Sequence, residues 1–344
     1  RIRKMKKNFK TILMLVLCTV LAIGALALSG CQKSGAVSGK TKVKIGMTQI
    51  VLHDSLDMCR QGAIDKLAEL GYVEGENLEI VFQDAQGDPA VGSTIAQQFV
   101  ADNVDMILAI ATPSAQAAYA AGMEKGIPVV FSAVTDPIAA QLAAPDGSAL
   151  DNITGTSDQM PIPEAFDLIK KLVPDAVKVG ILHNTSEVNS DVQLAQARQV
   201  AAEAGMEVID IGITSTNEIA SALDALLPQV DVVLNLTDNM VVSSIALEVE
   251  KCLAAGVPLF GSEETQVMNG AFASAGVDYY NLGLQTGAIM AQILSGTPAR
   301  DIPYETLKDC IITINTEVAA QLGIAIPEGI EADMVTTTTQ TGEE

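Results

Sequence analysis

Residues 105–137, with the sequence DMILAIATPSAQAAYAAGMEKGIPVVFSAVTDP, contain two short apolar runs separated by a helix-forming stretch. The apolar runs, Asp105–Ile110 and Val129–Phe131, have the length of buried strands, and Ala115–Lys125 has the pattern of a helix. Gly126-Ile127-Pro128 ends that helix, because glycine terminates a helix and proline cannot continue one. A strand, a helix and a second strand in this order predict a βαβ unit with parallel strands.

The same alternation continues along the chain in two comparable series, 43–142 and 158–259. The predicted strands are Val43–Met47, Leu78–Gln83, Asp105–Ile110, Val129–Phe131, Val177–Leu182, Glu207–Ile211 and Asp231–Leu236. The predicted helices are Leu56–Leu70, Ser93–Ala101, Ala115–Lys125, Pro163–Leu172, Asp191–Ala204, Glu218–Leu226 and Val242–Ala255. We therefore expect an α/β protein of two doubly wound parallel-sheet lobes with a hinge and a ligand cleft at the carboxyl ends of the strands.

Later segments suggest how the lobes are shared along the chain. A strand-like segment, Gly270–Val277, precedes a helical pattern at Leu282–Leu294, and a final strand and helix follow at Ile311–Leu322. These are too few for a third domain, so we expect the chain to return to the first lobe and end on the second. The expected parts are a tether at 31–42, a first lobe at 43–157 and about 271–300, a second lobe at 158–270 and about 301–330, and an acidic, frayed tail at 331–344.

The first thirty residues have the features of an export signal. Six basic residues precede or begin an apolar run, Ile12–Leu28, which leads into Leu28-Ser29-Gly30-Cys31. A basic region, an apolar region and a small-residue cleavage site define a secretory signal. The alternative is a transmembrane anchor, but the run is slightly shorter than the span of about 20 residues that a bilayer needs. The Leu-Ser-Gly-Cys ending resembles the lipobox of bacterial lipoproteins, so we expect signal cleavage at 1–30 and lipidation of Cys31.

The mature chain is strongly acidic. The sequence has 20 Lys and Arg against 42 Asp and Glu, and removal of the signal and its six basic residues leaves a net charge of about −28. Such a surface repels nucleic-acid phosphates and gains no affinity from counterion release, so no nucleic-acid partner is expected.

Cysteine and histidine usage gives no sign of a disulfide framework or a metal site. Cys18 leaves with the signal, and the remaining structural cysteines, Cys59, Cys252 and Cys310, are odd in number and far apart. The two histidines, at 53 and 183, lie in no metal-binding motif, and no cofactor is expected. The sequence also lacks the nucleotide-binding G-x-G-x-x-G and phosphate-binding loop motifs and the G-x-S-x-G nucleophile elbow. Cys59 and Cys252 could imitate a two-cysteine racemase, but both lie inside predicted helices instead of at strand ends.

Small polar residues follow two predicted strands of the first lobe, where helices begin. A Thr or Asp before proline, as at Thr112 and Asp136, is an ordinary start of a helix. On the cleft side of a lobe, the same free N–H groups and helix dipoles also form a natural carboxylate site. The expected ligand contacts from these loops are Thr112, Ser114, Ala115, Ser132, Thr135 and Asp136.

The second lobe offers acidic and amide groups. Asp238 follows the strand Asp231–Leu236 and either caps the next helix or faces a ligand ammonium across the cleft. Glu263 is a second candidate for the ammonium. Asn189 and Ser190, in the loop after Val177–Leu182, either cap a helix or donate hydrogen bonds to the ligand.

Seven strings carry a family resemblance: Gly46–Val51, Gly71–Gly75, Ala109–Ala118, Phe131–Pro137, Leu182–Ser190, Leu236–Asn239 and Gly276–Gly283. Together they resemble the ABC-transporter substrate-binding lipoproteins related to tryptophan- and tyrosine-type binding proteins, in order and over nearly the whole mature chain. The resemblance implies a type I periplasmic-binding-protein fold whose lobes close on an amino-acid-like ligand. Ser, Thr and backbone N–H groups would hold the ligand carboxylate, and an acid would hold the amine.

One string departs from the family. Members often carry an Ile-Val-Glu-His-Pro-like string where this chain has Ile50-Val51-Leu52-His53-Asp54. That string lies in the first loop after a strand, beside Gln49, which we also expect to contact the ligand. The chain has no Trp, and aromatic residues make up 3% of it, so few rings are available to stack on an aromatic ligand.

The resemblance implies a lipid-anchored receptor at the extracytoplasmic face of the cell membrane. It would capture a small amino acid, aromatic amino acids included, and deliver it to an ABC permease and its ATPase. The alternatives are a ligand-sensing module for a membrane receptor kinase and, less favoured, a two-cysteine racemase-type enzyme. A transcription regulator of the same fold is least favoured, because an export signal stands where a basic DNA-binding headpiece would be.

Overall fold

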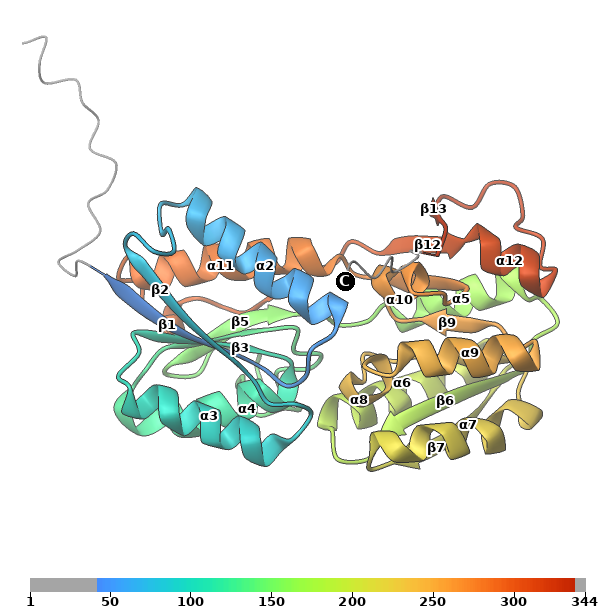
Figure 1. The fold of residues 1–344 in the computed structure, drawn as a ribbon, viewed down its shortest axis with the longest axis horizontal. Helices are drawn as coiled ribbons and strands as arrows, with labels where there is room; N and C mark the ends of the chain where they lie inside the picture. The colour runs from blue at the N-terminus through green and yellow to red at the C-terminus, as the bar shows by residue number, and fades with distance from the viewer. Residues whose placement is uncertain (1–41, 338–344) are drawn as a thin grey trace, which may run out of the picture. The chain divides into compact units, whose positions relative to one another are not determined.

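A computed structural model describes residues 42–337 and shows an α/β protein built on two sheets (Figure 1). The expected signal, Cys31 and nearly all of its tether lie outside the described residues, as do residues 338–344 of the expected tail. All seven predicted strands and all seven predicted helices are confirmed as elements, with ends that differ by a few residues.

The first sheet contains β1 (Val43–Gln49), β2 (Leu78–Asp84), β3 (Met106–Ile110), β4 (Val129–Ser132), β5 (Ile153–Ser157) and β11 (Glu305–Thr306). The strands lie in the order β11-β5-β4-β3-β1-β2, and all pairs are parallel. Helices α3 (Pro89–Ala101) and α4 (Thr112–Gly122) cover one face, while α2 (Asp54–Glu69) and α11 (Tyr279–Leu294) pack together over the other (Figure 1). Because both faces are covered, β3 and β4 are buried along their whole length.

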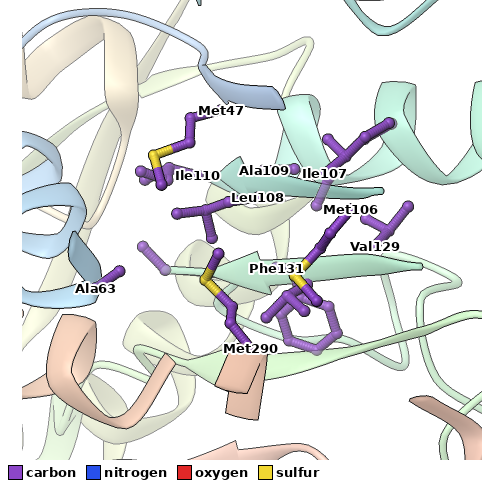
Figure 2. Packing of buried hydrophobic residues seen from close by; sticks show 14 of the residues in the cluster. Met47, Ala63, Met106, Ile107, Leu108, Ala109, Ile110, Val129, Phe131 and Met290 are labelled. Atoms are coloured by element: carbon purple, nitrogen blue, oxygen red, sulfur yellow. The ribbon is translucent and has the colours of Figure 1, made fainter. Parts of the chain in front are cut away.

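The core of this first lobe joins the sheet to its helices. Figure 2 shows Met47 of β1 and Phe131 of β4 in one cluster with Ala63 of α2 and Met290 of α11, and all four side chains are fully buried. Tight packing of this kind fixes the positions of the strand ends. The loops that leave those ends are therefore held in place relative to α2 and α11.

Glycines allow α2 and α11 to touch through their backbones. A Cβ atom added at Gly283 would lie 2.1 Å from the carbonyl oxygen of Cys59, and one at Gly62 would lie 2.3 Å from that of Tyr280. No side chain fits at such distances, so both positions require glycine. The close contact holds the first turn of α11, and with it Tyr279, against the first lobe.

The second sheet contains β6 (Lys178–Asn184), β7 (Glu207–Ile213), β8 (Val232–Leu234), β9 (Leu259–Gly261), β10 (Ala273–Gly276), β12 (Ile311–Asn315) and β13 (Asp333–Val335). The order is β13-β12-β10-β9-β8-β6-β7, and β10 and β12 form its antiparallel pair. Helices α5 (Ile162–Leu172) and α6 (Val188–Glu203) pack on one face, and α7 (Ile219–Leu226) and α9 (Ile245–Ala255) on the other. The remaining helices are α8 (Asn239–Val242), α10 (Glu264–Met268) and α12 (Thr316–Leu322), with 3-10 turns η1 (Met123–Lys125), η2 (Thr216–Glu218), η3 (Leu227–Gln229) and η4 (Ala299–Asp301).

The predicted fold class, two doubly wound α/β lobes, is confirmed, but three short segments differ from the expected boundaries. β10 lies in the second sheet, although residues 271–300 were expected in the first lobe. β11 lies in the first sheet, although residues 301–330 were expected in the second lobe. β13 pairs with β12, so residues 333–335 of the expected frayed tail form a strand instead. Each segment has four residues or fewer, which is too short for a periodic pattern to show which sheet it joins.

Three segments of the chain therefore cross between the sheets: β5 to α5, β10 to α11, and β11 to β12. Asp158 begins the first crossing and Asp278-Tyr279 completes the second. Among residues 42–337, no helix has the length and apolar character needed to cross a bilayer.

Candidate functional site

A narrow cavity lies between the loops at the carboxyl ends of strands from both sheets. The first lobe and its crossing segments contribute helix starts and loop residues, and the second lobe contributes the starts of α8 and α10. The residues that line it are His53, Ser55, Leu56, Thr112, Ala133, Thr135, Asp158, Asn189, Thr237, Asp238, Asn239, Val242, Ser262, Glu263, Gln266 and Tyr279.

The structure brings five of the residues predicted from the sequence together in this lining. They are Thr112, Thr135, Asn189, Asp238 and Glu263. All five follow strand ends or begin helices, which is the feature on which the prediction depended.

Three other predicted residues lie next to the lining without belonging to it. Ser190 donates a hydrogen bond of 2.6 Å to the Asp238 carboxylate. Ser114 and Ala115 are buried in the first turn of α4, behind Thr112, and the Ser114 hydroxyl has no partner among the described residues. These residues lie next to lining residues and help to hold them in position.

Gln49 and Asp136 do not line the cavity and have local partners. The Gln49 amide donates to the carbonyl of Val51 at 2.8 Å and to the carboxylate of Asp57 at 3.0 Å. The Asp136 carboxylate accepts the N–H groups of Ile138 and Ala139 at 3.0 and 2.9 Å, so it caps a turn.

Ser132 belongs to a buried cluster beneath the site. Its hydroxyl lies 2.8 Å from the Cys59 sulfur, 2.6 Å from the Thr286 hydroxyl and 3.1 Å from the Thr156 hydroxyl. The cluster joins α2, β4, β5 and α11 below the cavity lining.

The start of α4 has the properties of an anion site. Within the described residues the Thr112 side chain makes no hydrogen bond, and the first N–H groups of a helix have no intrahelical partner. Ala111 and Ala133, which flank the cavity, have φ angles of +75° and +54°. Residues other than glycine rarely adopt these angles, and such strain concentrates at ligand-binding loops.

Asp238 occupies the N-cap of α8 and is almost fully enclosed by donors. Its carboxylate accepts the N–H of Asn184 at 2.5 Å, the Ser190 hydroxyl at 2.6 Å and the N–H of Val241 at 3.0 Å. Burial raises its pKa, and these hydrogen bonds oppose that shift. Both functions expected of Asp238 are therefore compatible with its place: it caps a helix and it lines the cavity.

Glu263 has the same arrangement at α10. Its carboxylate accepts the N–H of Thr265 at 2.6 Å, the Thr265 hydroxyl at 2.8 Å and the N–H of Gln266 at 3.2 Å. Burial raises its pKa as well.

The sequence analysis missed a third acid, Asp158, together with Tyr279. The Tyr279 hydroxyl donates to the Asp158 carboxylate at 2.6 Å, and the Thr135 hydroxyl donates to it at 3.3 Å. Burial raises the pKa of Asp158. The signal that could have found it is the strand-end rule, since Asp158 directly follows β5, but β5 was not predicted as a strand.

His53 was also missed as a lining residue, although the sequence placed it in a cleft loop. Burial lowers its pKa to about 4, so its imidazole is neutral at neutral pH. Its Nδ1 atom has no hydrogen-bond partner among the described residues. A neutral imidazole can offer a ligand either a donor or an acceptor.

A further acid, Glu187, lies behind the second-lobe wall. Its carboxylate accepts the side-chain amides of Asn184, Asn189 and Asn239, at 3.1, 3.0 and 2.5 Å. Burial and the neighbouring Asp238 raise its pKa to about 7. Two buried acids, Glu187 and Asp238, are therefore close together, and their negative potential favours a cation on this side of the cavity.

Direct hydrogen bonds hold the two sides of the cavity together. The hydroxyls of Ser55 and Thr265 are 2.9 Å apart, and those of Thr135 and Thr237 are 3.1 Å apart. The amide of Asn269 donates to Asp54 at 2.8 Å. These bonds keep the two lobes closed on the cavity.

Cys59 and Cys252 offer no reactive thiolate. Burial raises the pKa of both Cys59 and Cys252 to about 12, and both lie within helices. Among residues 42–337, no group of His, Cys, Asp and Glu side chains is arranged to hold a metal ion.

Comparison with known proteins gives consistent matches over the chain. The family described as ABC transporter substrate binding protein matches residues 44–337. A tyrosine-binding protein of Clostridioides difficile is 38% identical over 322 residues, which cover 91% of this chain and 92% of that protein.

Two solved structures show the same fold. A Streptococcus pneumoniae ABC domain in complex with L-Trp is 35% identical, with a TM-score of 0.82 over 85% of this chain and 99% of that one. A ligand-free, open substrate-binding protein with adhesive properties from Clostridium difficile is 37% identical, with a TM-score of 0.66 over 86% of this chain and 100% of that one. The higher score against the ligand complex agrees with the closed lobes seen here.

Proposed function

The chain belongs to the ABC transporter substrate-binding protein family, which is not enzymatic, and we propose that its ligand is a zwitterionic α-amino acid with an aromatic side chain. The observation that carries the proposal is the distribution of charge around the cavity. Its described lining contains three carboxylic acids, Asp158, Asp238 and Glu263, and neither Lys nor Arg. An ammonium group supplies the positive charge that these buried acids lack.

The ligand carboxylate would bind to neutral and positive groups of the cavity. Thr112 and the free N–H groups at the start of α4 suit a carboxylate, since the positive end of the helix dipole lies there. The neutral His53 imidazole adds a hydrogen-bonding group. A cavity lined by both acids and a helix start offers partners for the two charges of an amino acid.

Support for an aromatic side chain comes from the relatives. One is named a tyrosine-binding protein and another was solved with L-Trp. Leu56, Val242 and the ring of Tyr279 give the lining an apolar part that suits such a side chain.

The cellular setting is part of the proposal. Lipid on Cys31 would keep the receptor at the extracytoplasmic face of the membrane, close to an ABC permease and its ATPase. The family and the signal-like start of the sequence support this placement.

A thermal-shift screen followed by calorimetry tests the ligand class. Residues 32–344 would be screened against all common amino acids, sugars and nucleosides. Because a ligand stabilises the state that binds it, L-Trp or L-Tyr should raise the melting temperature in a concentration-dependent way. A shift with sugars or nucleosides and none with any amino acid would contradict the proposal.

A further inference from the structure

Asp158 differs from the other acids of the cavity in its surroundings. The residue is 2% exposed, and the side chains that hydrogen-bond to its carboxylate are two hydroxyls, those of Tyr279 and Thr135. Within the described residues no Lys, Arg or His forms an ion pair with it. Its carboxylate also accepts its own backbone N–H. A carboxylate offers about four lone-pair positions, so Asp158 can accept one more donor.

Asp238 and Glu263 differ from Asp158 in the kind of donor that stabilises their charge. Each accepts two backbone N–H groups at the start of a short helix and one hydroxyl as well. Their charge is thus already stabilised by helix starts, as expected of N-cap residues. Of the three acids, Asp158 gains most from a cation brought by a ligand.

Asp158 is also connected to both lobes. The Thr135 hydroxyl that donates to Asp158 lies 3.1 Å from the Thr237 hydroxyl of the second lobe. The Gln193 amide, from α6, donates to both threonine hydroxyls. With each hydroxyl donating onward, the hydrogen bonds run from Gln193 through Thr237 and Thr135 to the Asp158 carboxylate.

We infer that Asp158 is the residue that binds the ligand ammonium directly, and that Thr135 and Thr237 couple this contact to closure of the lobes. The inference rests on the proposed function, since it needs a ligand with an amine. Charge on Asp158 orients the Thr135 hydroxyl toward it, which leaves that oxygen free to accept from Thr237 and Gln193. An ammonium that keeps Asp158 ionised therefore stabilises contacts between the lobes. Asp238 and Glu263 contribute the negative potential of the wall and the positions of α8 and α10.

Asp158→Asn tests the assignment with two ligands that differ by the amine alone. The probes are L-Trp and indole-3-propionate, or L-Tyr and 3-(4-hydroxyphenyl)propionate if the wild type prefers tyrosine. Loss of a buried charge pair is large, so Kd for the amino acid should rise at least about 100-fold. Kd for the propionate should stay within about threefold or fall, because the propionate leaves Asp158 without a counter-charge. The exposed Asp175, changed to Asn, is the matched control and should alter neither value.

The wild-type titration distinguishes failure of the proposed function from failure of the Asp158 assignment. If the wild type binds no amino acid, the proposed function fails. If it binds one and Asp158→Asn leaves that Kd unchanged, or weakens both ligands equally, this inference alone is overturned. If Asp158→Asn does not fold, Tyr279→Phe is tested with the same two ligands. A several-fold loss of affinity for the amino acid with none for the propionate supports the assignment of Asp158. Equal changes in the two affinities contradict it.

Discussion

The hydroxyl of Tyr279 donates a hydrogen bond of 2.6 Å to the carboxylate of Asp158, and the bond joins two of the segments that cross between the lobes. Asp158 leaves β5 of the first sheet toward the second lobe, and Tyr279 opens α11 on the return from β10. A ligand at this carboxylate would therefore contact a crossing segment as well as the cavity. Under the proposed function, this relationship would link occupation of a small site to the arrangement of two lobes.

Removal of the Asp238 carboxylate should weaken ligand binding while the protein stays folded. We expect Asp238→Ala to raise Kd for the amino acid at least about tenfold, or roughly 1.4 kcal/mol, by isothermal titration. Loss of the α8 cap should also lower the free energy of unfolding by about 1 kcal/mol. Asp224→Ala, which removes an exposed partner of Lys251, is the control. Unchanged affinity in Asp238→Ala would remove Asp238 from the ligand site.

Two glycine substitutions should have opposite effects on stability. Gly283→Ala forces a Cβ atom to 2.1 Å from the Cys59 carbonyl, so α2 and α11 must separate, and we expect a loss of about 2 kcal/mol or more in chemical denaturation. Gly92 lies within α3, and the Cβ of Gly92→Ala would be 3.6 Å from the Cβ of Ala85, which is an ordinary contact. It should be neutral or stabilise by up to about 1 kcal/mol, since alanine favours a helix. Equal losses in the two variants would show that the helix contact is not tight.

Much of the fold could be predicted because most of its strands are apolar and several of its helices, such as α9 and α12, end at a glycine. β5 could not, because Ile153–Ser157 has one large apolar residue in five. Its burial comes from its place between β4 and β11 and from α11, which covers it, and these neighbours are distant in sequence. β11 and β13 have two and three residues, too few for any periodic pattern.

The site could be predicted as far as strand ends were recognised. Thr112, Thr135 and Asp238 follow predicted strands and line the cavity. Asp158 follows β5, and so the missed strand also hid the acid. Ser132 and Gln49 also stand at strand ends, but their side chains contact residues of α2. The sequence pattern does not indicate which way such a side chain points.

The proposed lipid anchor on Cys31 is testable without the structure. Cys31→Ser should abolish incorporation of labelled fatty acid and shift the protein from the detergent phase to the aqueous phase in a Triton X-114 partition of expressing bacteria. The ligand affinity of the purified body, residues 32–344, should be unaffected. Incorporation of label by Cys31→Ser would place the anchor elsewhere.

Thr135→Val should loosen the closed state more than it alters the fold. The variant removes the hydroxyl that meets Asp158, Thr237 and Gln193, so contacts between the lobes are lost. We expect the ligand dissociation rate to rise about three- to tenfold in stopped-flow displacement, with the association rate within about twofold. Thr94→Val, on the exposed face of α3, is the control and should leave both rates unchanged. A dissociation rate equal to that of the wild type would show that this hydroxyl does not hold the lobes closed.

Glu248 should make the protein less stable as pH rises. It is fully buried in α9, and burial raises the pKa of its carboxyl to about 8 from the ordinary 4.5. The folded state therefore holds a proton that the unfolded state releases, so this contribution to stability is full below pH 4.5 and declines up to about pH 8. Glu248→Gln, which keeps the shape without the titrating proton, should remove that decline and exceed the wild type in melting temperature at pH 8. Melting curves of both proteins between pH 5 and 8.5 measure the difference, and parallel curves would contradict the assignment.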